Sequence, residues 1–348
     1  MALDLLLPRG NTEEGVDESL AQFVRRRLGR EALERMAQPM VAGIYTADPE
    51  RLSLRATMPR FLEMERLDRS VILGMLKRAS RQTRAETNGT SGARYSLFLS
   101  FDGGMQTLVD ELSLALPAAS IQLNSKVASL QLDRSSGGWT VNTESGSSTR
   151  ADAVCIAVPT YAAAQLLQET DSKLSEELKS ISYASTATVN LAYKRGDIPH
   201  LLDGFGFVVP FIEKRSLIAC SFSSVKFPGR APNGSVLLRA FVGGALQPDM
   251  FGLDEVKMLQ RVQADLRELL GIERAPLFTE VIRWPRSMPQ YEIGHLDRVQ
   301  RIDNRLAQLP TIKLVGNAYR GAGIPDCIRS GEQAAEALKS FFEIKGPQ

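Results

Sequence analysis

The segment 313–336 holds the residues whose types and spacing best suit chemistry. Its pattern predicts a strand that ends at Gly316, a loop that holds Gly321 and Gly323, and a helix that begins near Asp326. Glycines let backbone amides approach a ligand closely. A helix N-terminus offers free N–H groups and about half a positive charge. The segment therefore suits phosphate oxygens or a planar electron-accepting ring that is anionic when reduced. It is also compatible with a plain strand–turn–helix that has a capping Asp, since glycine-rich loops before helices are common.

Composition excludes several other classes of protein. The 348 residues are 43% hydrophobic and 24% charged, which is typical of a globular chain of about two domains. A net charge of +2 argues against nucleic-acid binding. Two His and three widely spaced Cys predict neither a zinc site nor a disulfide framework, and they suit a reducing cytoplasm. No apolar run reaches the roughly 18–20 residues of a spanning helix, and the early Asp4 argues against a signal peptide.

The elements that must position the segment fall into two parts. Residues 12–90 have helical spacing, with Asp17 as the expected N-cap and the polar stretch 79–94 as an expected loop. From Tyr95 the period becomes that of strands. We expect strands at 95–101, 120–123, 127–132, 139–142, 153–157, 188–193, 206–209, 217–222, 236–242, 278–284 and 312–315. We expect helices at 105–116, 160–180, 254–270, 296–309 and 326–342. This order predicts an α+β chain with two sheets.

Several segments together resemble a known family. Segment 313–336 is similar to the C-terminal flavin signature of the protoporphyrinogen oxidases, which belong to the superfamily of flavin amine oxidases and phytoene desaturases. Further similar segments follow in the same order: 43–53, 58–59 and 69–74, then 101–108, 219–228 and 241–244, then Trp284 with 289–291 and 294–295. The resemblance covers nearly the whole chain.

The resemblance implies a fold of the α+β or α/β class. It comprises an FAD-binding domain of the glutathione-reductase type, a helical subdomain and a mixed antiparallel substrate-binding sheet. Residues 1–94 would form the helical, membrane-associating subdomain, 95–165 and 296–348 the FAD-binding parts, and 166–295 the substrate-binding sheet and helices. Relatives begin with a strand, a G-x-G-x-x-G turn and a helix. Since this sequence has no such fingerprint, we expect an N-terminally truncated chain that lacks the first βαβ unit.

The resemblance also implies particular site residues. FAD would be bound through residues that match an adenine contact, a flavin-contacting tryptophan and the turn beneath the flavin ring: Val127, Trp284, Gly316, Gly323, Ile324 and Asp326. The tetrapyrrole would meet Phe222, Val209, Tyr45 and Ala47. Val127, Trp284, Phe222 and Val209 could instead be ordinary core or sheet residues. A few cations should bind the propionates, but the family's substrate arginine lies in the missing part. No catalytic base and no metal ligand is predicted.

The implied reaction removes six electrons from a porphyrinogen in three two-electron steps. Flavin accepts hydride and dioxygen reoxidises it. We expect protoporphyrinogen IX as the substrate, with coproporphyrinogen III as the alternative within the family. The sequence is also compatible with an amine oxidase, a desaturase or an inactive truncated fragment. The expected partners are the porphyrinogen, dioxygen and, peripherally, a membrane, but no nucleic acid. The expected location is the cytoplasm, at the periphery of the inner membrane.

Overall fold

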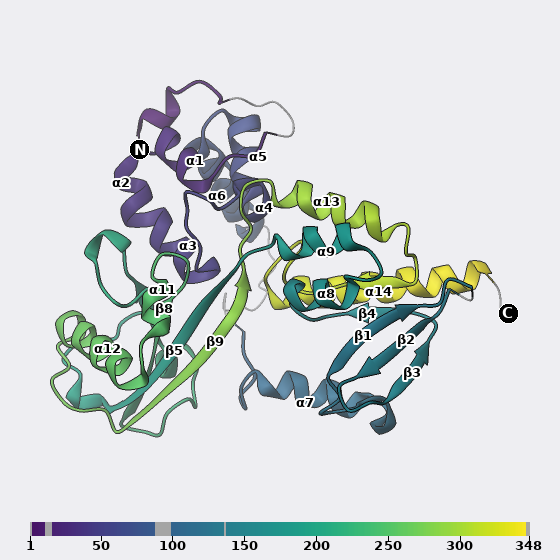
Figure 1. Ribbon diagram of the computed structural model, residues 1–348. Coiled ribbons are helices and arrows are strands. Elements are labelled where there is room, and N and C mark those ends of the chain that lie inside the picture. The colour runs from purple at the N-terminus through teal and green to yellow at the C-terminus, as the bar shows by residue number, and fades with distance from the viewer. Residues whose placement is uncertain (1, 11–15, 88–98, 136, 346–348) are drawn as a thin grey trace. The chain divides into compact units, whose positions relative to one another are not determined.

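The chain divides into two compact units (Figure 1). The computed structural model describes residues 2–10, 16–87, 99–135 and 137–345. The first unit comprises Met1–Ala115 and Ala184–Met288, and the second comprises Leu116–Tyr183 and Pro289–Gln348. Each unit has its own hydrophobic core. The four functional segments expected from the sequence stay predictions, because a division into compact units does not test what each segment binds.

The first unit begins with a helical block, which we define as residues 2–10 and 16–87. It contains η1 (Ala2–Leu5), α1 (Leu20–Arg27), α2 (Arg30–Ala32), the π-helical turn η2 (Leu33–Ala37), α3 (Gln38–Tyr45), α4 (Leu54–Thr57), α5 (Pro59–Asp68) and α6 (Val71–Thr87). Ser19 and Gln22 form a capping box at the start of α1. The expected cap Asp17 instead accepts a hydrogen bond from Ser53 Oγ, so that prediction is wrong.

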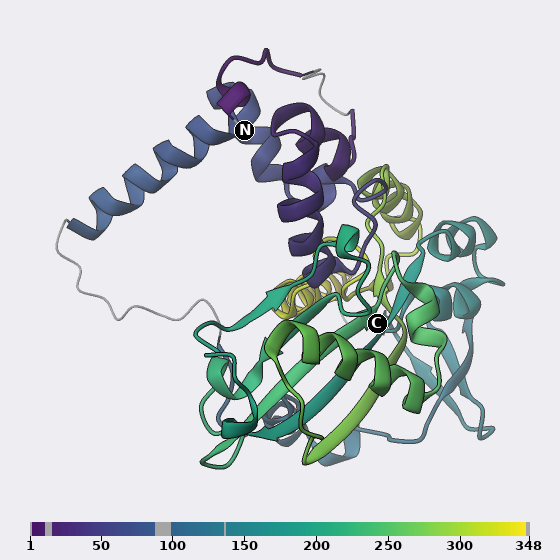
Figure 2. The ribbon, with the colours of Figure 1, turned by 90° about the vertical axis from the view of Figure 1, so that its left-hand side faces the viewer.

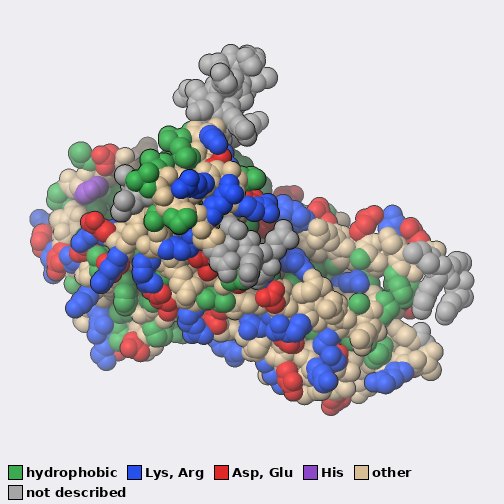
Figure 3. Space-filling view, turned by 90° about the horizontal axis from the view of Figure 1, so that it is seen from above, with side chains coloured by type: hydrophobic (Ala, Val, Ile, Leu, Met, Phe, Trp, Pro, Cys, Tyr) green, Lys and Arg blue, Asp and Glu red, His purple; other side chains and the backbone are tan. Residues whose placement is uncertain are grey.

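Helix α6 corrects the expected loop at 79–94. The helix continues to Thr87, and residues 88–94 lie outside the described part. Its beginning exposes the apolar residues Leu73, Met75 and Leu76 directly before the exposed basic residues Lys77 and Arg78. Figure 3 shows hydrophobic and basic side chains interspersed on one face of the molecule. No helix in the described part is long and apolar enough to cross a membrane.

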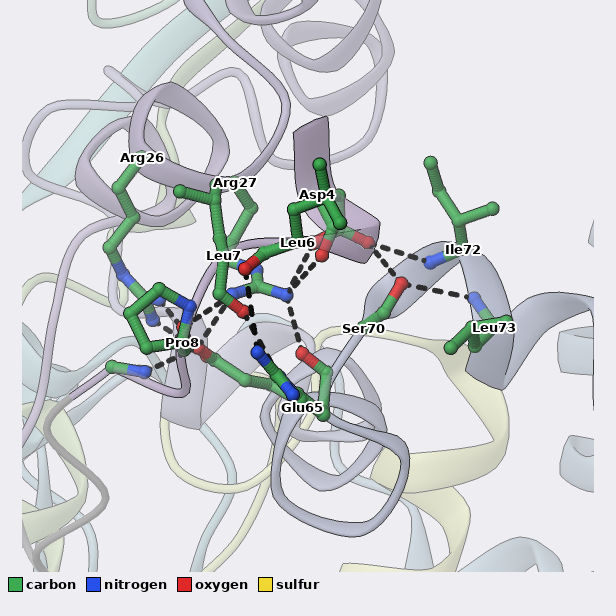
Figure 4. A network of polar contacts seen from close by, with 12 residues as sticks. Asp4, Leu6, Leu7, Pro8, Arg26, Arg27, Glu65, Ser70, Ile72 and Leu73 are labelled. Carbon is green, nitrogen blue, oxygen red and sulfur yellow. Dashed lines mark hydrogen bonds and ion pairs between the residues drawn. The ribbon is translucent and has the colours of Figure 1, made fainter. Parts of the chain in front are cut away.

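A buried ionic network holds the helical block together (Figure 4). The Arg27 side chain is 1% exposed, and its Nη2 lies 2.5 Å from Asp4 Oδ1. Glu65 Oε1 lies 3.5 Å from Arg27 Nη1 and 2.6 Å from Arg26 Nη1. The other oxygen of Asp4 accepts a hydrogen bond from Ser70 Oγ, at the start of α6. The network therefore joins the N-terminal segment to α1, α5 and α6.

The rest of the first unit is a five-stranded sheet with its covering helices. Its strands follow the order β6 (Gly206–Val208), β7 (Ala219–Phe222), β8 (Ser235–Gly243), β5 (Tyr183–Lys194) and β9 (Phe278–Pro289). Neighbours from β6 to β5 run antiparallel. Shorter elements are η4 (Arg195–Asp197), η5 (Phe211–Glu213), α10 (Ser223–Lys226) and α11 (Pro248–Gly252), while α7 (Gln106–Ala115) precedes the sheet in the chain.

One face of this sheet is closed by α12 (Glu255–Leu270), as Figure 2 shows. Alternate residues of a strand point to opposite faces. Leu191 on β5 and Leu238 on β8 therefore point to the same side, where they pack with Val262 and Leu266 of α12. Asp254 caps α12 by accepting a hydrogen bond from the Lys257 amide, which fixes the start of the helix one residue after the expected bound.

In the residues that the structure describes, the second unit combines two small sheets with four α-helices. An antiparallel sheet contains β1 (Val127–Leu132), β2 (Trp139–Thr143) and β3 (Ser148–Ala151), and a parallel pair contains β4 (Val154–Ile156) and β10 (Ile312–Leu314). The helices are α8 (Thr160–Leu167), α9 (Ser172–Lys179), α13 (His295–Leu306) and α14 (Ile324–Lys345), with the turn η3 (Ala118–Ser120). The hairpin and the final strand and helix are confirmed close to their expected bounds.

Two expected strands are wrong in the described residues. Residues 118–120 form η3, and 121–123 are not in a strand. Of the expected strand 95–101, residues 95–98 lie outside the described part, and 99–101 are not extended in a sheet. A strand needs a partner for its backbone groups, and a local apolar pattern does not supply one.

Candidate functional site

The segment singled out by its glycines lines a groove in the second unit. We call residues 316–323 the glycine loop; it connects β10 to α14. The groove has a volume of about 660 Å³, within the range of small-molecule sites. Its walls are the facing sides of α13 and α14, the end of β10, and the loop residues Gly316, Tyr319, Arg320 and Gly321.

Two glycines of the loop have conformations that explain their residue type. Gly316 has φ +114°, and no heavy atom lies within 4 Å of the place a Cβ would take. A ligand can therefore approach the backbone there. Gly321 has φ +153°, and its Cβ would lie 2.5 Å from Asp326 Cγ. The Gly316 amide donates to Ser330 Oγ at 3.1 Å, which ties the end of β10 to α14.

The start of α14 offers fewer free amides than the sequence suggested. The helix begins at Ile324, two residues before the expected start. Pro325 has no amide hydrogen. The amides of Asp326 and Cys327 both donate to the Gly323 carbonyl, at 3.1 and 3.0 Å. These amides are therefore not available to a ligand, which corrects the expectation of bare N–H groups along the first turn.

Two aromatic side chains hold the glycine loop through hydrogen bonds to its backbone atoms. The Tyr291 hydroxyl donates to the Asn317 carbonyl at 2.7 Å and accepts from the Gly321 amide at 2.9 Å. His295 Nε2 lies 2.9 Å from the Tyr319 carbonyl. The rings of Tyr291 and His295 stack with centroids 4.0 Å apart, and both residues are buried. We call this pair the Tyr291–His295 clasp.

The sequence named Tyr291 and His295 only as parts of a family pattern. It offered one local signal, an aromatic ring and an imidazole four residues apart before an expected helix. Their hydrogen bonds go to backbone atoms 24 to 30 residues further along the chain. Only the folded chain shows that they shape the loop.

The polar groups of the groove suit a flavin. Tyr319 lines the groove, and its buried hydroxyl has no hydrogen-bond partner among the described residues. Burial raises the pKa of this hydroxyl, so it stays a neutral donor. Lys313 and Arg320 add positive charge to the lining, although Arg320 also pairs with Asp303. An approachable glycine backbone and nearby cations together fit an electron-accepting ring with phosphates.

The expected FAD residues are distributed over both units. Gly316 and Asp326 line the groove, and Gly323 and Ile324 lie in the loop and first turn between them. Val127 begins β1 and packs partly against the core of the second unit. Trp284 lies on β9 of the first unit with 49% of its surface exposed. Their contacts with FAD stay predictions.

Three of the four expected tetrapyrrole residues are buried. Val209 and Ala47 do come together, but the cavity they line is only about 20 Å³, enough for about one water molecule. Phe222 is 2% exposed and packs in the core beneath α12. Tyr45 is half-buried, with its hydroxyl 3.5 Å from the Thr57 carbonyl. Val209, Ala47 and Phe222 form closed packing in this structure, and the contacts of all four residues with a tetrapyrrole stay predictions.

The side of the sheet away from α12 provides a wider surface. We define the open face as the following side chains, which lie on the side of their strands away from α12: Ser221 on β7, Arg239 and Phe241 on β8, Thr188 and Asn190 on β5, and Glu280 and Trp284 on β9. Ser221 and Asn190 are both Cα partners of Arg239, and Thr188 is the partner of Phe241. This face therefore carries both aromatic and polar groups.

The comparisons with known proteins agree with a flavin site. The family model of the flavin containing amine oxidoreductases matches residues 5–339. The chain is 34% identical to a coproporphyrinogen III oxidase from Bacillus subtilis, covering 98% of this chain and 71% of that protein. It is 30% identical to a protoporphyrinogen oxidase from Bos taurus, covering 95% and 70%. A solved structure from Exiguobacterium sp. 255-15, provisionally assigned as a protoporphyrinogen oxidase, matches with a TM-score of 0.81 and 29% identity, covering 98% and 71%.

Proposed function

Because the chain belongs to the flavin-containing amine oxidoreductase family, we propose that it acts as an FAD-dependent oxidase of a porphyrinogen. The observation that carries this proposal is the glycine loop. It joins β10 to α14 at the edge of a groove, within a chain that is similar over 98% of its length to a porphyrinogen oxidase.

The residues that would hold the flavin belong to the groove. Gly316 offers approachable backbone, and Lys313 offers a cation for a phosphate. When bound, the flavin supplies a two-electron acceptor that dioxygen can reoxidise. The protein contributes position and electrostatics, because hydride transfer to a cofactor needs little acid–base equipment. The Tyr291–His295 clasp keeps the loop in one conformation before the ligand arrives.

Coproporphyrinogen III is the substrate that we propose first. It is named in the relatives with the higher identities, at 34% for both the Bacillus and the Propionibacterium proteins. This reverses the preference drawn from the sequence alone. Protoporphyrinogen IX is the second candidate, supported by the protein from Bos taurus at 30%. Both are wide tetrapyrroles with carboxylate side chains, and they need a larger surface than the closed cavity beside Ala47 and Val209.

The test compares the two substrates directly. The purified protein is assayed for bound flavin by its absorbance, and then for porphyrin fluorescence and hydrogen peroxide as each porphyrinogen is oxidised in air. We expect faster formation of coproporphyrin than of protoporphyrin, after subtraction of enzyme-free autoxidation. Faster formation of protoporphyrin would favour the second candidate. A flavin-loaded protein that oxidises neither substrate above background would refute the proposed function.

A further inference from the structure

We propose that Arg239, on the open face of the sheet, anchors a carboxylate of the substrate. The inference rests on the proposed function, since it assigns a binding residue for the porphyrinogen. The buried residues expected to meet the substrate include no cation. The open face provides a cation, Arg239, on β8, which is the middle strand of the sheet. Strands β7 and β5 lie on either side of β8.

Arg239 is held by one edge of its guanidinium. Its Nε donates to Asn190 Oδ1 at 2.8 Å, and Asn190 Nδ2 donates to Glu280 Oε2 at 3.2 Å. Asn190 is 4% exposed, so the amide that aims the arginine is itself fixed. The row Arg239–Asn190–Glu280 thus spans three adjacent strands, β8, β5 and β9. Arg239 itself is exposed.

The opposite edge of the guanidinium is available to a ligand. Among the residues that the structure describes, Arg239 forms no ion pair, and its hydrogen bond to Asn190 uses only Nε. The two terminal nitrogens match the two oxygens of a carboxylate in a bidentate pair. Glu280 is two strands away, so Asn190 separates its negative charge from the arginine.

The surroundings of Arg239 suit a wide, flat molecule. Phe241 is two residues further along β8 on the same face, and Ala219 is its Cα partner on β7. Trp284 lies on the same side of β9 as Glu280, four residues along, which corresponds to about 13 Å of strand. An arginine that shares one face of the sheet with the aromatic side chains of Phe241 and Trp284 suits a flat molecule that carries carboxylates.

A cycle of protein and ligand variants tests the assignment. The ligands are coproporphyrin III, which has four carboxylates, and its tetramethyl ester, which has none, both in one detergent buffer. The proteins are the wild type, R239M, R239K and the control R267M. Arg267 is an exposed arginine of α12, on the covered side of the sheet, so its removal changes the net charge equally. Binding is followed by porphyrin fluorescence, which does not depend on turnover.

We expect R239M to weaken binding of the free acid roughly 10- to 100-fold, as for a lost charge-assisted hydrogen bond. Binding of the ester should change less than twofold, and R239K should recover part of the affinity for the acid. R267M should bind both ligands like the wild type. With porphyrinogen as substrate, R239M should raise KM while kcat changes little, because the anchor is remote from the reacting carbon.

Two results would overturn the inference. Equal losses for the acid and the ester in R239M would show a structural effect, and equal affinity of R239M and wild type for the acid would show no contact. Thermal unfolding of each variant identifies any loss of folding separately. If the wild-type protein bound neither ligand and oxidised no porphyrinogen, the proposed function itself would fail.

Discussion

Replacing Tyr291 by Phe should weaken FAD binding, because one hydroxyl holds two points of the glycine loop. The hydroxyl donates to the Asn317 carbonyl at 2.7 Å and accepts from the Gly321 amide at 2.9 Å. The change removes a single oxygen atom and leaves the ring stacked on His295. Its effect therefore falls on the conformation of the loop and not on the packing of the core.

The size of the effect follows from the two hydrogen bonds. A buried amide that loses its acceptor costs about 1–3 kcal/mol, and the lost bond to the carbonyl adds about 1 kcal/mol. Part of this cost is relieved when the loop relaxes in the absence of ligand. If about 2 kcal/mol must then be supplied by FAD to restore the bound conformation, its dissociation constant rises roughly 30-fold.

The assay is a titration of the apoprotein with FAD, followed by flavin fluorescence, alongside urea unfolding. Y183F is the matched control. The Tyr183 hydroxyl also accepts a backbone amide in the second unit, from Thr160 at 3.0 Å, but at the start of α8. Both variants should lose stability, and only Y291F should lose FAD affinity. If Y291F binds FAD within twofold of the wild type, or if Y183F weakens binding equally, the clasp has no special role in the flavin site.

Three further outcomes follow from other parts of the chain. D4N removes the carboxylate that faces the buried Arg27 guanidinium, and should cost the first unit about 3–5 kcal/mol in urea unfolding; a loss below about 1 kcal/mol would contradict this. Burial raises the pKa of Glu65, but hydrogen bonds, chiefly from Arg26, outweigh it and hold that pKa below its usual range. The resulting stability is present above the ordinary pKa and disappears as pH falls through the lowered one, so E65Q should flatten the acid side of the stability profile. The exposed apolar and basic start of α6 should bring the protein to anionic vesicles in a flotation assay, and recovery only in the soluble fraction would count against membrane contact.

Several elements were determined by local sequence alone. The helix α12 has a continuous apolar stripe that ends before a glycine, so its bounds were predicted to within one residue. The strand–loop–helix at 312–345 was found from its glycines, because φ above zero and close approach leave few other residue types. The family resemblance also came from residues in sequence order. For α12 and for the strand–loop–helix the signal lies within one continuous stretch of the chain, whereas the resemblance is spread over nearly its whole length.

Tertiary structure decided which of those residues are buried and which are exposed. Val209 and Phe222 have the alternation of strand residues, but an alternating pattern does not say which side a helix will cover. The same alternating pattern did not single out Arg239, because the sequence does not show that α12 covers the opposite face of the sheet. In the sequence, Asp4 served only as an argument against a signal peptide. In the structure it forms a buried ion pair with Arg27. Tyr291 acts on backbone atoms far along the chain. Sequence patterns record local preference, whereas burial and long-range pairing depend on what the rest of the chain brings alongside.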